Sequence, residues 1–500
     1  MNELPAPLYT AEQTRLLDKI AINEAGIPGF TLMKRAAKSA FVALMQRWPH
    51  VRTVTILCGG GNNGGDGFVI ASLAQQKGWL VQARYVGDTD FAQKLRGEAF
   101  EAWQWACAEG VEFLPFDLDE PIVGDVIVDA MLGTGLNGDV RADFANAIRR
   151  VNRSNKRVLA VDIPSGLSAD TGAVLGVAVK ASVTVTFIGL KLGLLMNQAV
   201  DYVGELQFDG LRIPDSVYES VNVSAFRLGP EDVVECLPRR KRSAHKGDFG
   251  HLLVIGGDHG MGGAAIMAAE AAVNVGAGKV TLATRPEHVV AALIRCPEIM
   301  ACGINSGQEL APLLDKVDAV VFGPGLGLGA WAEQMLQALW NSSLPCVVDA
   351  DGLNLLQRTG KLYELDRSNW VITPHPGEAA RLLSQSIALV QQDRLQTARR
   401  LHETTGGTVV LKGAGTLVTD GDVMHLCSAG NPGMASGGMG DLLSGIIGAL
   451  IAQKLSPVDA ARVGVYAHAA AADRSAAADG ERGLKATDLN PYVKLILNNR

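Results

Sequence analysis

A glycine-rich segment that ends in an acid carries the most chemical information in this 500-residue chain. Residues 436–441 read Ser-Gly-Gly-Met-Gly-Asp and lead into an apolar stretch with the 3, 4 spacing of a buried helix. The first N–H groups of such a helix lack partners and attract phosphate. Asp441 would there accept a proton from a hydroxyl that attacks the phosphoryl group. We predict a phosphoryl-transfer site, with a simple first-turn acid as the alternative.

Three loops in the first half of the chain also combine acids with glycines, each after a predicted strand. They span residues 59–67, 129–139 and 162–167. Ligands of open α/β sheets bind at the carboxyl ends of the strands, so we expect these loops to form one site. In the first loop, Asn62, Asn63 and Asp66 suit hydrogen bonds to sugar hydroxyls or an amide, or ligation of a hard cation.

The second half contains its own series of glycine- and acid-bearing segments, most of them at the ends of predicted strands. They span residues 245–250, 256–263, 323–327, 349–354, 373–378, 412–416 and 431–441. The P-loop pattern G-x-x-x-x-G-K-[ST] is not present in the sequence, which argues against a P-loop NTPase.

The elements that must position these loops are short β-branched runs that alternate with helix-length segments. The first half contains five such runs, at 54–58, 81–86, 126–131, 158–163 and 183–187. The second half contains seven, at 252–255, 280–283, 319–322, 346–349, 370–373, 409–412 and 417–418. This rhythm predicts an α/β protein of two doubly wound domains.

The ends of the domains also have signals in the sequence. Thr10 and Gln13 have the capping-box spacing and predict a first helix. The periodicity is lost around 211–245, where prolines and a short basic run occur. We therefore predict domains over 1–222 and 227–500.

Composition limits the classes of function. The net charge of −7 argues against general nucleic-acid binding. Seven cysteines without a Cys-x-x-Cys pair indicate reduced thiols rather than a disulfide framework or a zinc site. The N-terminal residues lack the apolar region of a signal peptide, and no apolar run is long enough to cross a bilayer. We expect a cytoplasmic protein without membrane or nucleic-acid partners.

The loops of the first domain resemble those of NAD(P)H-hydrate epimerases, which implies a Rossmann-like fold. The resemblance implies that the hydrated nicotinamide nucleotide contacts two loops and that Asp162 lies at the reacting ring, as our acid/base candidate. The loop residues are Asn62, Asn63, Gly64, Gly65, Asp66, Gly133, Thr134, Gly135, Leu136, Asn137, Gly138 and Asp139. It further implies a potassium ion held by Asn63, Asp129 and Ser165.

The motifs of residues 227–500 resemble the ADP- or ATP-dependent NAD(P)H-hydrate dehydratases, of ribokinase-like fold. The resemblance implies that Gly263, Gly325, His375 and Asp441 line the hydrated cofactor. The adenine nucleotide would be lined by Lys412, Gly413, Ala414, Gly415, Thr416 and Gly440. Similarity to fused bacterial enzymes favours ADP over ATP, and analogy with sugar kinases suggests Glu378 as a group that helps to hold magnesium.

Together these resemblances predict a repair enzyme for the hydrates of NADH and NADPH, called NADHX and NADPHX. One domain would interconvert the R and S forms at the ring carbon that bears the hydroxyl. The other would phosphorylate that hydroxyl in the S form and eliminate phosphate, with Asp441 as the base. Epimerisation would make the whole damaged pool available to a stereospecific dehydratase. We also expect a homo-oligomer.

Three alternatives remain open. A ribokinase-fold kinase of a small alcohol, with a nucleotide-sensing first domain, would use the same anion site but release a stable phosphorylated product. A catalytically silent first domain would be a binding module, although Asn63, Asp129 and Asp162 are all present. A dehydrogenase has only the G-x-G-x-x-G match of Gly59, Gly61 and Gly64, with Asp88 after the next strand, in its favour.

Overall fold

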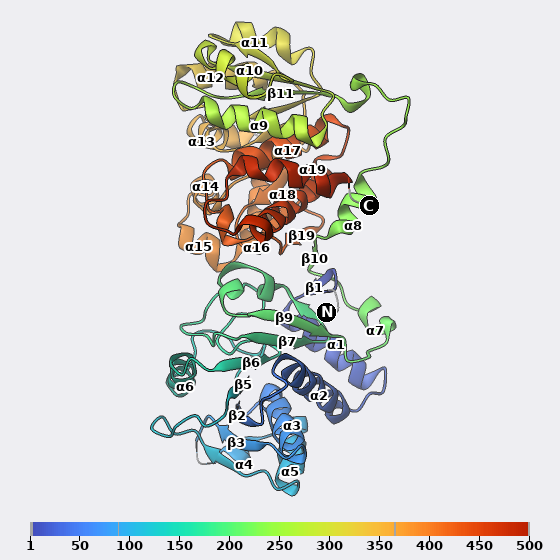
Figure 1. Cartoon of the computed structure of the whole chain (residues 1–500), viewed down its shortest axis with the longest axis vertical. Helices are drawn as coiled ribbons and strands as arrows, with labels where there is room; N and C mark the ends of the chain where they lie inside the picture. The colour runs from blue at the N-terminus through green and yellow to red at the C-terminus, as the bar shows by residue number, and fades with distance from the viewer. Residues whose placement is uncertain (1–3, 89, 365–366, 499–500) are drawn as a thin grey trace. The chain divides into compact units, whose positions relative to one another are not determined.

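The structure is a computed structural model that describes residues 4–88, 90–364 and 367–498. The chain folds as two compact units, residues 1–225 and 226–500 (Figure 1). Both units are α/β, as the alternating sequence pattern predicts. Each unit is described by itself below.

Unit 1 contains a seven-stranded sheet in the order β4-β3-β2-β5-β6-β7-β9, and all its strand pairs are parallel. The order reverses direction beside β2, which is the signature of a doubly wound sheet. Leu57 lies opposite Arg84 of β3 and Asp129 of β5. The strands are β2 (Thr53–Cys58), β3 (Leu80–Tyr85), β4 (Phe113–Pro115), β5 (Val126–Ala130), β6 (Arg157–Val161), β7 (Val183–Phe187) and β9 (Glu205–Asp209). A separate parallel pair joins β1 (Pro7–Tyr9) to β8 (Leu190–Lys191).

Helices cover both faces of this sheet because side chains alternate along each strand. Ile56 and Val128 pack into one apolar cluster with α2 and α3, whereas Leu57 and Ile127 pack with α6 in another. The helices are α1 (Ala11–Asn23), α2 (Gly29–Arg47), α3 (Asn62–Gln76), α4 (Phe91–Lys94), α5 (Gly97–Ala108), α6 (Ala142–Arg153) and α7 (Asp215–Glu219), with short 3₁₀ turns at Leu192–Leu195 and Asn197–Asp201. The predicted capping box at the start of α1 is confirmed, with hydrogen bonds in both directions between Thr10 and Gln13.

Unit 2 contains strands in the order β13-β12-β11-β14-β15-β16-β17-β18-β19-β10. The pairs from β13 to β17 are parallel, the pairs of β18 with β17 and β19 are antiparallel, and β19 pairs with β10 in parallel. The strands are β10 (Ala225–Arg227), β11 (His251–Ile255), β12 (Lys279–Thr284), β13 (Met300–Gly303), β14 (Ala319–Phe322), β15 (Cys346–Val348), β16 (Trp370–Ile372), β17 (Thr408–Leu411), β18 (Thr416–Thr419) and β19 (Met424–Cys427).

The helices of unit 2 include the one that the opening motif predicts, α17 (Met439–Ala452). The others are α8 (Pro230–Cys236), α9 (Gly262–Val275), α10 (Val289–Arg295), α11 (Gly307–Leu314), α12 (Ala330–Trp340), α13 (Asp351–Arg358), α14 (Pro376–Leu382), α15 (Ile387–Gln392), α16 (Arg394–Thr405), α18 (Pro457–Asp479) and α19 (Asn490–Asn498), with 3₁₀ turns at Lys246–Phe249, Pro286–His288, Lys361–Glu364, Pro432–Met434 and Ala486–Leu489.

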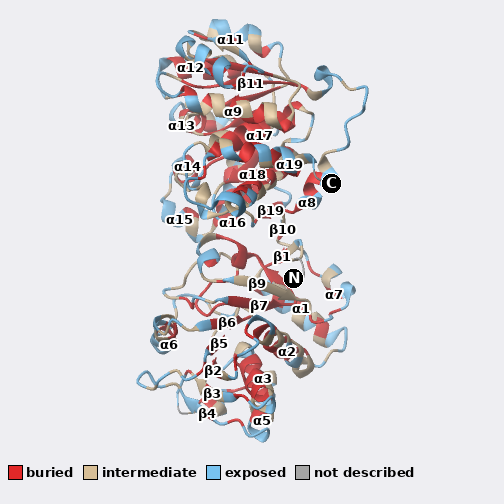
Figure 2. Cartoon of the chain, viewed as in Figure 1, coloured by how far each residue is buried: buried red, intermediate tan, exposed pale blue. Residues whose placement is uncertain are grey.

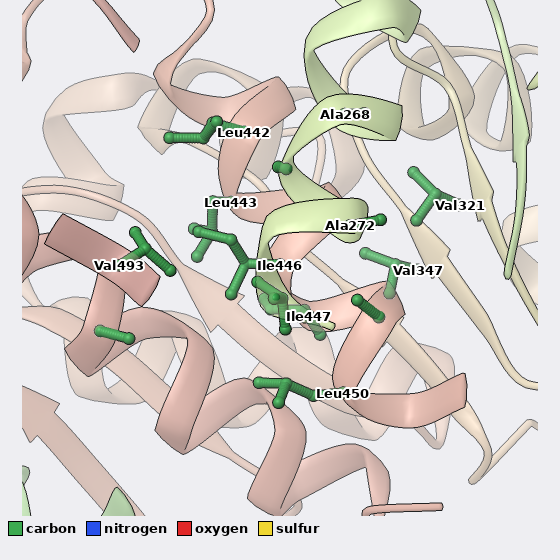
Figure 3. Close-up of a cluster of buried hydrophobic side chains, with 14 of the residues drawn as sticks. Ala268, Ala272, Val321, Val347, Leu442, Leu443, Ile446, Ile447, Leu450 and Val493 are labelled. Atoms are coloured by element: carbon green, nitrogen blue, oxygen red, sulfur yellow. The ribbon is translucent and has the colours of Figure 1, made fainter. Parts of the chain in front are cut away.

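The core of unit 2 lies between α9, α17, α18 and the sheet. Leu442 and Ile446 of α17 pack with Ala268 of α9 and with Val321 and Val347 of the sheet (Figure 3). Helix α17 is buried along nearly its whole length, as Figure 2 shows. A helix that is apolar all round cannot move freely, so the site at its N-terminus is held by the core.

The predicted strands all exist, with ends that differ by a few residues. The sequence reasoning missed β1, β4, β8, β9, β10, β13 and β19. β19 is buried but has no β-branched residue in its Met-His-Leu-Cys run. Among the others, β1, β4, β8 and β10 have only two or three residues, β13 lies at the end of its sheet, and β9 has no fully buried residue. Strands of this kind have little apolar patterning, because it is burial on both faces that makes a parallel strand conspicuous in sequence.

Candidate functional site

Unit 1 contains a cavity of about 1070 Å³ at the carboxyl ends of its strands. The first two predicted loops and the acid that opens the third meet there, as expected from the position of loops in open sheets. Ten of the predicted residues line it: Asn62, Asn63, Asp66, Gly133, Thr134, Gly135, Leu136, Asn137, Asp139 and Asp162. Gly64 and Gly65 instead lie buried in the first turn of α3, and a Cβ on Gly64 would fall 1.8 Å from the carbonyl oxygen of Gly59. Gly138 does not line the cavity and takes up the turn with a φ of +79°.

Asp162 is held by a buried cation at the edge of this cavity. Oδ1 of Asp162 accepts a hydrogen bond from Nζ of Lys191, from the hydroxyl of Thr186 at 3.2 Å and from the backbone N–H of Phe187 at 3.3 Å. The Lys191 side chain is 1% exposed and the Asp162 side chain 19% exposed. Asp162 also has a left-handed backbone with φ of +66°, which an aspartate adopts more easily than most residues. The carboxylate therefore has one fixed oxygen and a side that faces the cavity.

Asn63, which lines the cavity, is linked through the backbone of Leu132 to the fully buried pair of Asp129 and Ser165. The hydroxyl of Ser165 donates to Oδ1 of Asp129 at 2.6 Å, and Nδ2 of Asn63 donates to the carbonyl oxygen of Leu132 at 3.0 Å. Oδ1 of Asn63 is buried and has no hydrogen-bond partner among the described residues. Burial raises the pKa of Asp129 to about 6. A buried amide oxygen without a partner and a buried carboxylate are oxygen donors of the kind that a hard cation requires.

Besides Asp162, other carboxyl groups face the same cavity, among them Glu98 and Asp139. Asp18 of α1 and Asp66 of α3 both line it. Burial raises the pKa of Asp18 to about 7 and that of Asp66 well above its usual range, and the charge of Asp162 adds to both shifts. The cavity of unit 1 thus combines ionisable groups whose proton affinities differ, which is a common arrangement at catalytic sites.

In unit 2, a buried ion pair joins the ends of two strands. Nζ of Lys412, after β17, lies 2.7 Å from Oδ1 of Asp349, after β15. The hydroxyl of Ser444 in α17 donates to the other carboxylate oxygen, Oδ2, at 2.6 Å. Asp349 is 1% exposed, yet the attraction of Lys412 and the two hydrogen bonds outweigh burial and lower its pKa. The pair ties the nucleotide-loop residue Lys412 to the helix that carries Asp441.

The start of α17 has the geometry that the opening motif predicts. Gly438 caps the helix with a left-handed backbone at φ of +90°, and Asp441 lies in the first turn. A Cβ on Gly440 would come within 3.2 Å of Nζ of Lys412, so the absence of a side chain lets the ammonium approach the helix end. Burial, with the charge of Asp349, raises the pKa of Asp441 to about 6. A carboxyl group with this pKa is suited to act as a base near neutral pH.

The remaining predicted residues of unit 2 lie at the ends of other strands. Gly263 is exposed in the first turn of α9, and Gly325 follows β14 with φ of +58°. Nδ1 of His375 accepts from the N–H of Gly377 at 3.0 Å, which makes His375 the cap of α14. Glu378 accepts from the N–H of His375 and lies 3.9 Å from Nζ of Lys412.

The loop over residues 412–416 is a tight β17–β18 connection. The hydroxyl of Thr416 closes it by donating to the carbonyl oxygen of Gly413 at 2.9 Å, while Gly413 and Ala414 are exposed and Gly415 is buried. The buried guanidinium of Arg394 donates hydrogen bonds to the carbonyl oxygens of Leu411 and Gly415. This predicted nucleotide loop is therefore held in one conformation by Thr416 and Arg394.

Comparison with known proteins places both units in one family. A family model described as YjeF-related protein N-terminus matches residues 29–193, and one described as NAD(P)H-hydrate dehydratase matches residues 252–494. The chain is 48% identical to a bifunctional NAD(P)H-hydrate repair enzyme of Coxiella burnetii, over 98% of this chain and 99% of the relative. It is 44% identical to one of Escherichia coli, over 99% of this chain and 95% of the relative. The chain belongs to the bifunctional NAD(P)H-hydrate repair enzymes.

Solved structures agree with this family assignment for the second unit. A ribokinase-like superfamily protein of Enterococcus faecalis is 30% identical, covers 54% of this chain and 94% of its own, and superposes with a TM-score of 0.50. The predicted fold class, two fused doubly wound α/β domains with a ribokinase-like second one, is confirmed. Among the described residues, none of the helices has both the length and the apolar character needed to span a bilayer.

Several residues of this family member contribute to the two sites although the sequence reasoning did not select them. They are Asp18, Lys191, Asp349, Arg394 and Ser444. The segment 349–354 is one of the predicted strand-end motifs, but nothing in its sequence distinguishes Asp349 from an ordinary turn acid. Lys191 forms an ion pair with Asp162, which lies 29 positions earlier in the chain. No local sequence pattern indicates such a pair.

Proposed function

We propose that this chain repairs the hydrates NADHX and NADPHX, with epimerase activity in residues 1–222 and dehydratase activity in residues 227–500. The observation that carries the proposal is the full-length similarity to bifunctional repair enzymes, together with an acid-lined site in each unit. The epimerase interconverts the R and S hydrates, and the dehydratase returns the S hydrate to NADH or NADPH. Its substrates are small molecules, and we expect a cytoplasmic homo-oligomer.

The geometry of unit 1 supports the epimerase assignment. The cavity of about 1070 Å³ is large enough for a dinucleotide, and glycines of the 133–139 loop leave room for its backbone. We assign substrate contacts to the lining residues of the 62–66 and 133–139 loops. Asp162 is our candidate for the group that moves a proton at the carbon bearing the hydroxyl, because it is a fixed carboxylate at the cavity edge.

A potassium ion would be held by Asn63, Asp129 and Ser165. The unpartnered Oδ1 of Asn63 and the buried carboxylate of Asp129 fit such an ion, as described above. The ion would supply a fixed positive charge behind the 133–139 loop, where an anionic part of the nucleotide could bind. In this role it organises the loop and does not take part in proton transfer.

In unit 2, Asp441 would accept the proton of the ring hydroxyl while the N–H groups at the start of α17 hold the transferred phosphoryl group. Lys412 and the loop up to Thr416, with Gly440, would line the nucleotide, and Gly263, Gly325 and His375 the hydrated cofactor. We propose ADP as the phosphoryl donor, which leaves AMP and phosphate. By analogy with sugar kinases, Glu378 would help to hold the magnesium ion that accompanies the nucleotide phosphates.

The decisive experiment uses chemically hydrated NADH that contains both epimers. Purified protein, magnesium and either ADP or ATP are added, and the recovery of near-ultraviolet dihydropyridine absorbance is followed. We expect complete recovery with the wild type, recovery of only the S fraction with Asp162→Asn, and no recovery with Asp441→Asn. No recovery by the wild type with either nucleotide would contradict the proposal, and a stable phosphorylated product from a small alcohol would favour a kinase instead.

A further inference from the structure

The cavity of unit 1 contains more carboxyl groups than a single proton-transfer residue requires. Asp18, Asp66 and Asp162 come from α1, α3 and the end of β6, and each lines the cavity. Their charges act on one another and on Lys191, and Glu98 of α5 also faces Asp18. Arg15, Lys19 and Arg141 line the cavity as well, but Lys191 is the cation whose charge acts on both Asp18 and Asp66. Burial outweighs its attraction and raises the pKa of both carboxyl groups.

The ammonium group of Lys191 is bound to Asp162 and to two neighbouring oxygens. Besides that carboxylate, its Nζ donates to the hydroxyl of Thr186 at 3.1 Å and to the carbonyl oxygen of Phe187 at 3.0 Å, so all three of its N–H donors have acceptors. Every hydrogen bond that a described residue donates to Asp162 goes to Oδ1. Oδ2 of Asp162 is left as the proton acceptor for a ligand in the cavity.

Asp18 differs from Asp162 in its hydrogen bonding. It faces the cavity without a hydrogen-bond donor among the described side chains, and burial with the charges of Asp162 and Glu98 raises its pKa to about 7 against the opposing effect of Lys191. At neutral pH a substantial fraction of Asp18 is therefore protonated. Asp66 has a similar charge environment, but it is 9% exposed, so it has less access to a ligand than the half-buried Asp18.

We propose that Asp162 and Asp18 are the base and the acid of the epimerase reaction, and that Lys191 is the positioning residue that keeps Asp162 in the basic role. This inference rests on the proposed epimerase function. It assigns a proton donor that neither the motifs nor the resemblance identified. Pairs of carboxyl groups that are driven to different protonation states are a general solution to acid–base catalysis at neutral pH.

The reaction then proceeds without any added reactant. Oδ2 of Asp162 takes the proton of the ring hydroxyl, a C=O bond forms, and the bond from that carbon to the ring nitrogen breaks. The electron pair stays on nitrogen, which receives the proton of Asp18. Rotation about the neighbouring C–C bond presents the other face of the aldehyde, and the same two proton transfers in reverse close the ring as the other epimer.

The test measures interconversion of the separated R hydrate by chiral chromatography, without nucleotide, so that the dehydratase is silent. For the wild type we expect kcat to fall as the pH rises through about 7, where Asp18 loses its proton. Asp18→Asn should lower kcat by roughly 10²-fold and abolish this alkaline decline, with KM little changed. Asp18→Glu should restore part of the rate and the decline.

Lys191→Met tests whether Lys191 positions Asp162 for proton transfer or only stabilises the fold. Without the ammonium, Oδ1 of Asp162 loses its charged hydrogen-bond donor, so kcat should fall with KM little changed, and Lys191→Arg, which keeps a cation, should restore part of the rate. Glu12→Gln, an exposed carboxyl-to-amide change on the same helix as Asp18, is the matched control and should leave rate and profile unchanged. Thermal unfolding of each variant identifies any that fails to fold.

Different results would contradict the acid assignment of Asp18 and the epimerase function itself. If the wild type interconverts the epimers and folded Asp18→Asn keeps both its rate and its alkaline decline, the acid assignment is overturned while the epimerase function stands. If the wild type does not interconvert them above the spontaneous rate, the proposed function is itself wrong, and this inference falls with it.

Discussion

Each unit contains a buried lysine–aspartate pair at the carboxyl ends of parallel strands, yet the pairs differ in what surrounds them. In unit 1, Asp162 binds Lys191 through Oδ1 and keeps 19% of its side chain exposed toward the cavity. In unit 2, Asp349 is 1% exposed, and both of its oxygens are engaged, by Lys412 and Ser444. The acid that faces the proposed reaction there is a separate residue, Asp441.

The difference indicates two ways to build a charged site. In the functions proposed above, unit 1 assigns anchoring and proton transfer to the same carboxylate, so the residue that holds the lysine would also meet the ligand. Unit 2 separates them, because its reacting group lies on a helix end that must itself be positioned. A buried pair alone is weak evidence of catalysis, and the free oxygen and the cavity beside it are what distinguish Asp162.

The largest expected effect is that of Asp441→Asn on the dehydratase. Removing a general base typically lowers the rate by about 10²–10⁴-fold. Because the folded state raises the pKa of Asp441 to about 6, its ionised form opposes folding, and stability decreases as pH rises from its unfolded pKa toward 6. The inactive variant should thus melt at a higher temperature than the wild type at pH 8. A lower melting temperature would show that Asp441 also anchors the structure.

Asp162→Asn should damage the epimerase to a similar degree but without such a gain in stability. The substitution removes the proton acceptor and also leaves Lys191 without its counter-ion. Epimerase rate and melting temperature are measured on the same preparation, and dehydration of the pure S hydrate is the internal control. An unchanged epimerase rate in this variant would contradict the proposal that Asp162 both holds Lys191 and transfers the proton.

Asp349→Asn should act mainly on stability. Breaking a buried ion pair by removing one partner costs about 3–5 kcal/mol, since it leaves an uncompensated charge. Because the folded pKa of Asp349 is lowered, its contribution is present above its unfolded pKa and is lost as pH falls through the folded value. Chemical unfolding at pH 7 and at pH 3 should therefore show a smaller difference between wild type and variant at the lower pH. Equal differences at both pH values would contradict the anchoring role.

Gly440→Ala is expected to have the smallest effect. Its Cβ would lie 3.2 Å from Nζ of Lys412 and 3.4 Å from Oδ2 of Asp349, so the ion pair must shift slightly. Alanine favours helix by about 1 kcal/mol over glycine, which offsets the strain in stability. We expect near-wild-type melting with a higher KM for the nucleotide and an unchanged epimerase rate. An unchanged KM would show that Lys412 does not need its present position to serve the nucleotide.

Much of the fold was predictable because its signals are local. The β-branched runs, the capping box at Thr10 and the apolar face of α17 depend on neighbours within a few positions, and all three are present in the structure. The loops of the two candidate sites were predictable for a related reason, since a glycine-rich turn after a buried strand places its polar residues at one sheet edge. The strands β1, β4, β8, β9, β10, β13 and β19, which are very short, partly exposed or without β-branched residues, lacked such signals.

The amino-acid sequence already specifies which groups stand at each strand end, since the order of strands and turns brings those groups together in any α/β sheet of this kind. Which acid meets which base depends on the packed fold. Lys191 reaches Asp162 across 29 positions and Lys412 reaches Asp349 across 63. The proton affinities of Asp18 and Asp441 likewise come from burial and from charges on other elements. Protonation is set by the surrounding dielectric and charge, and these exist only once the chain is packed.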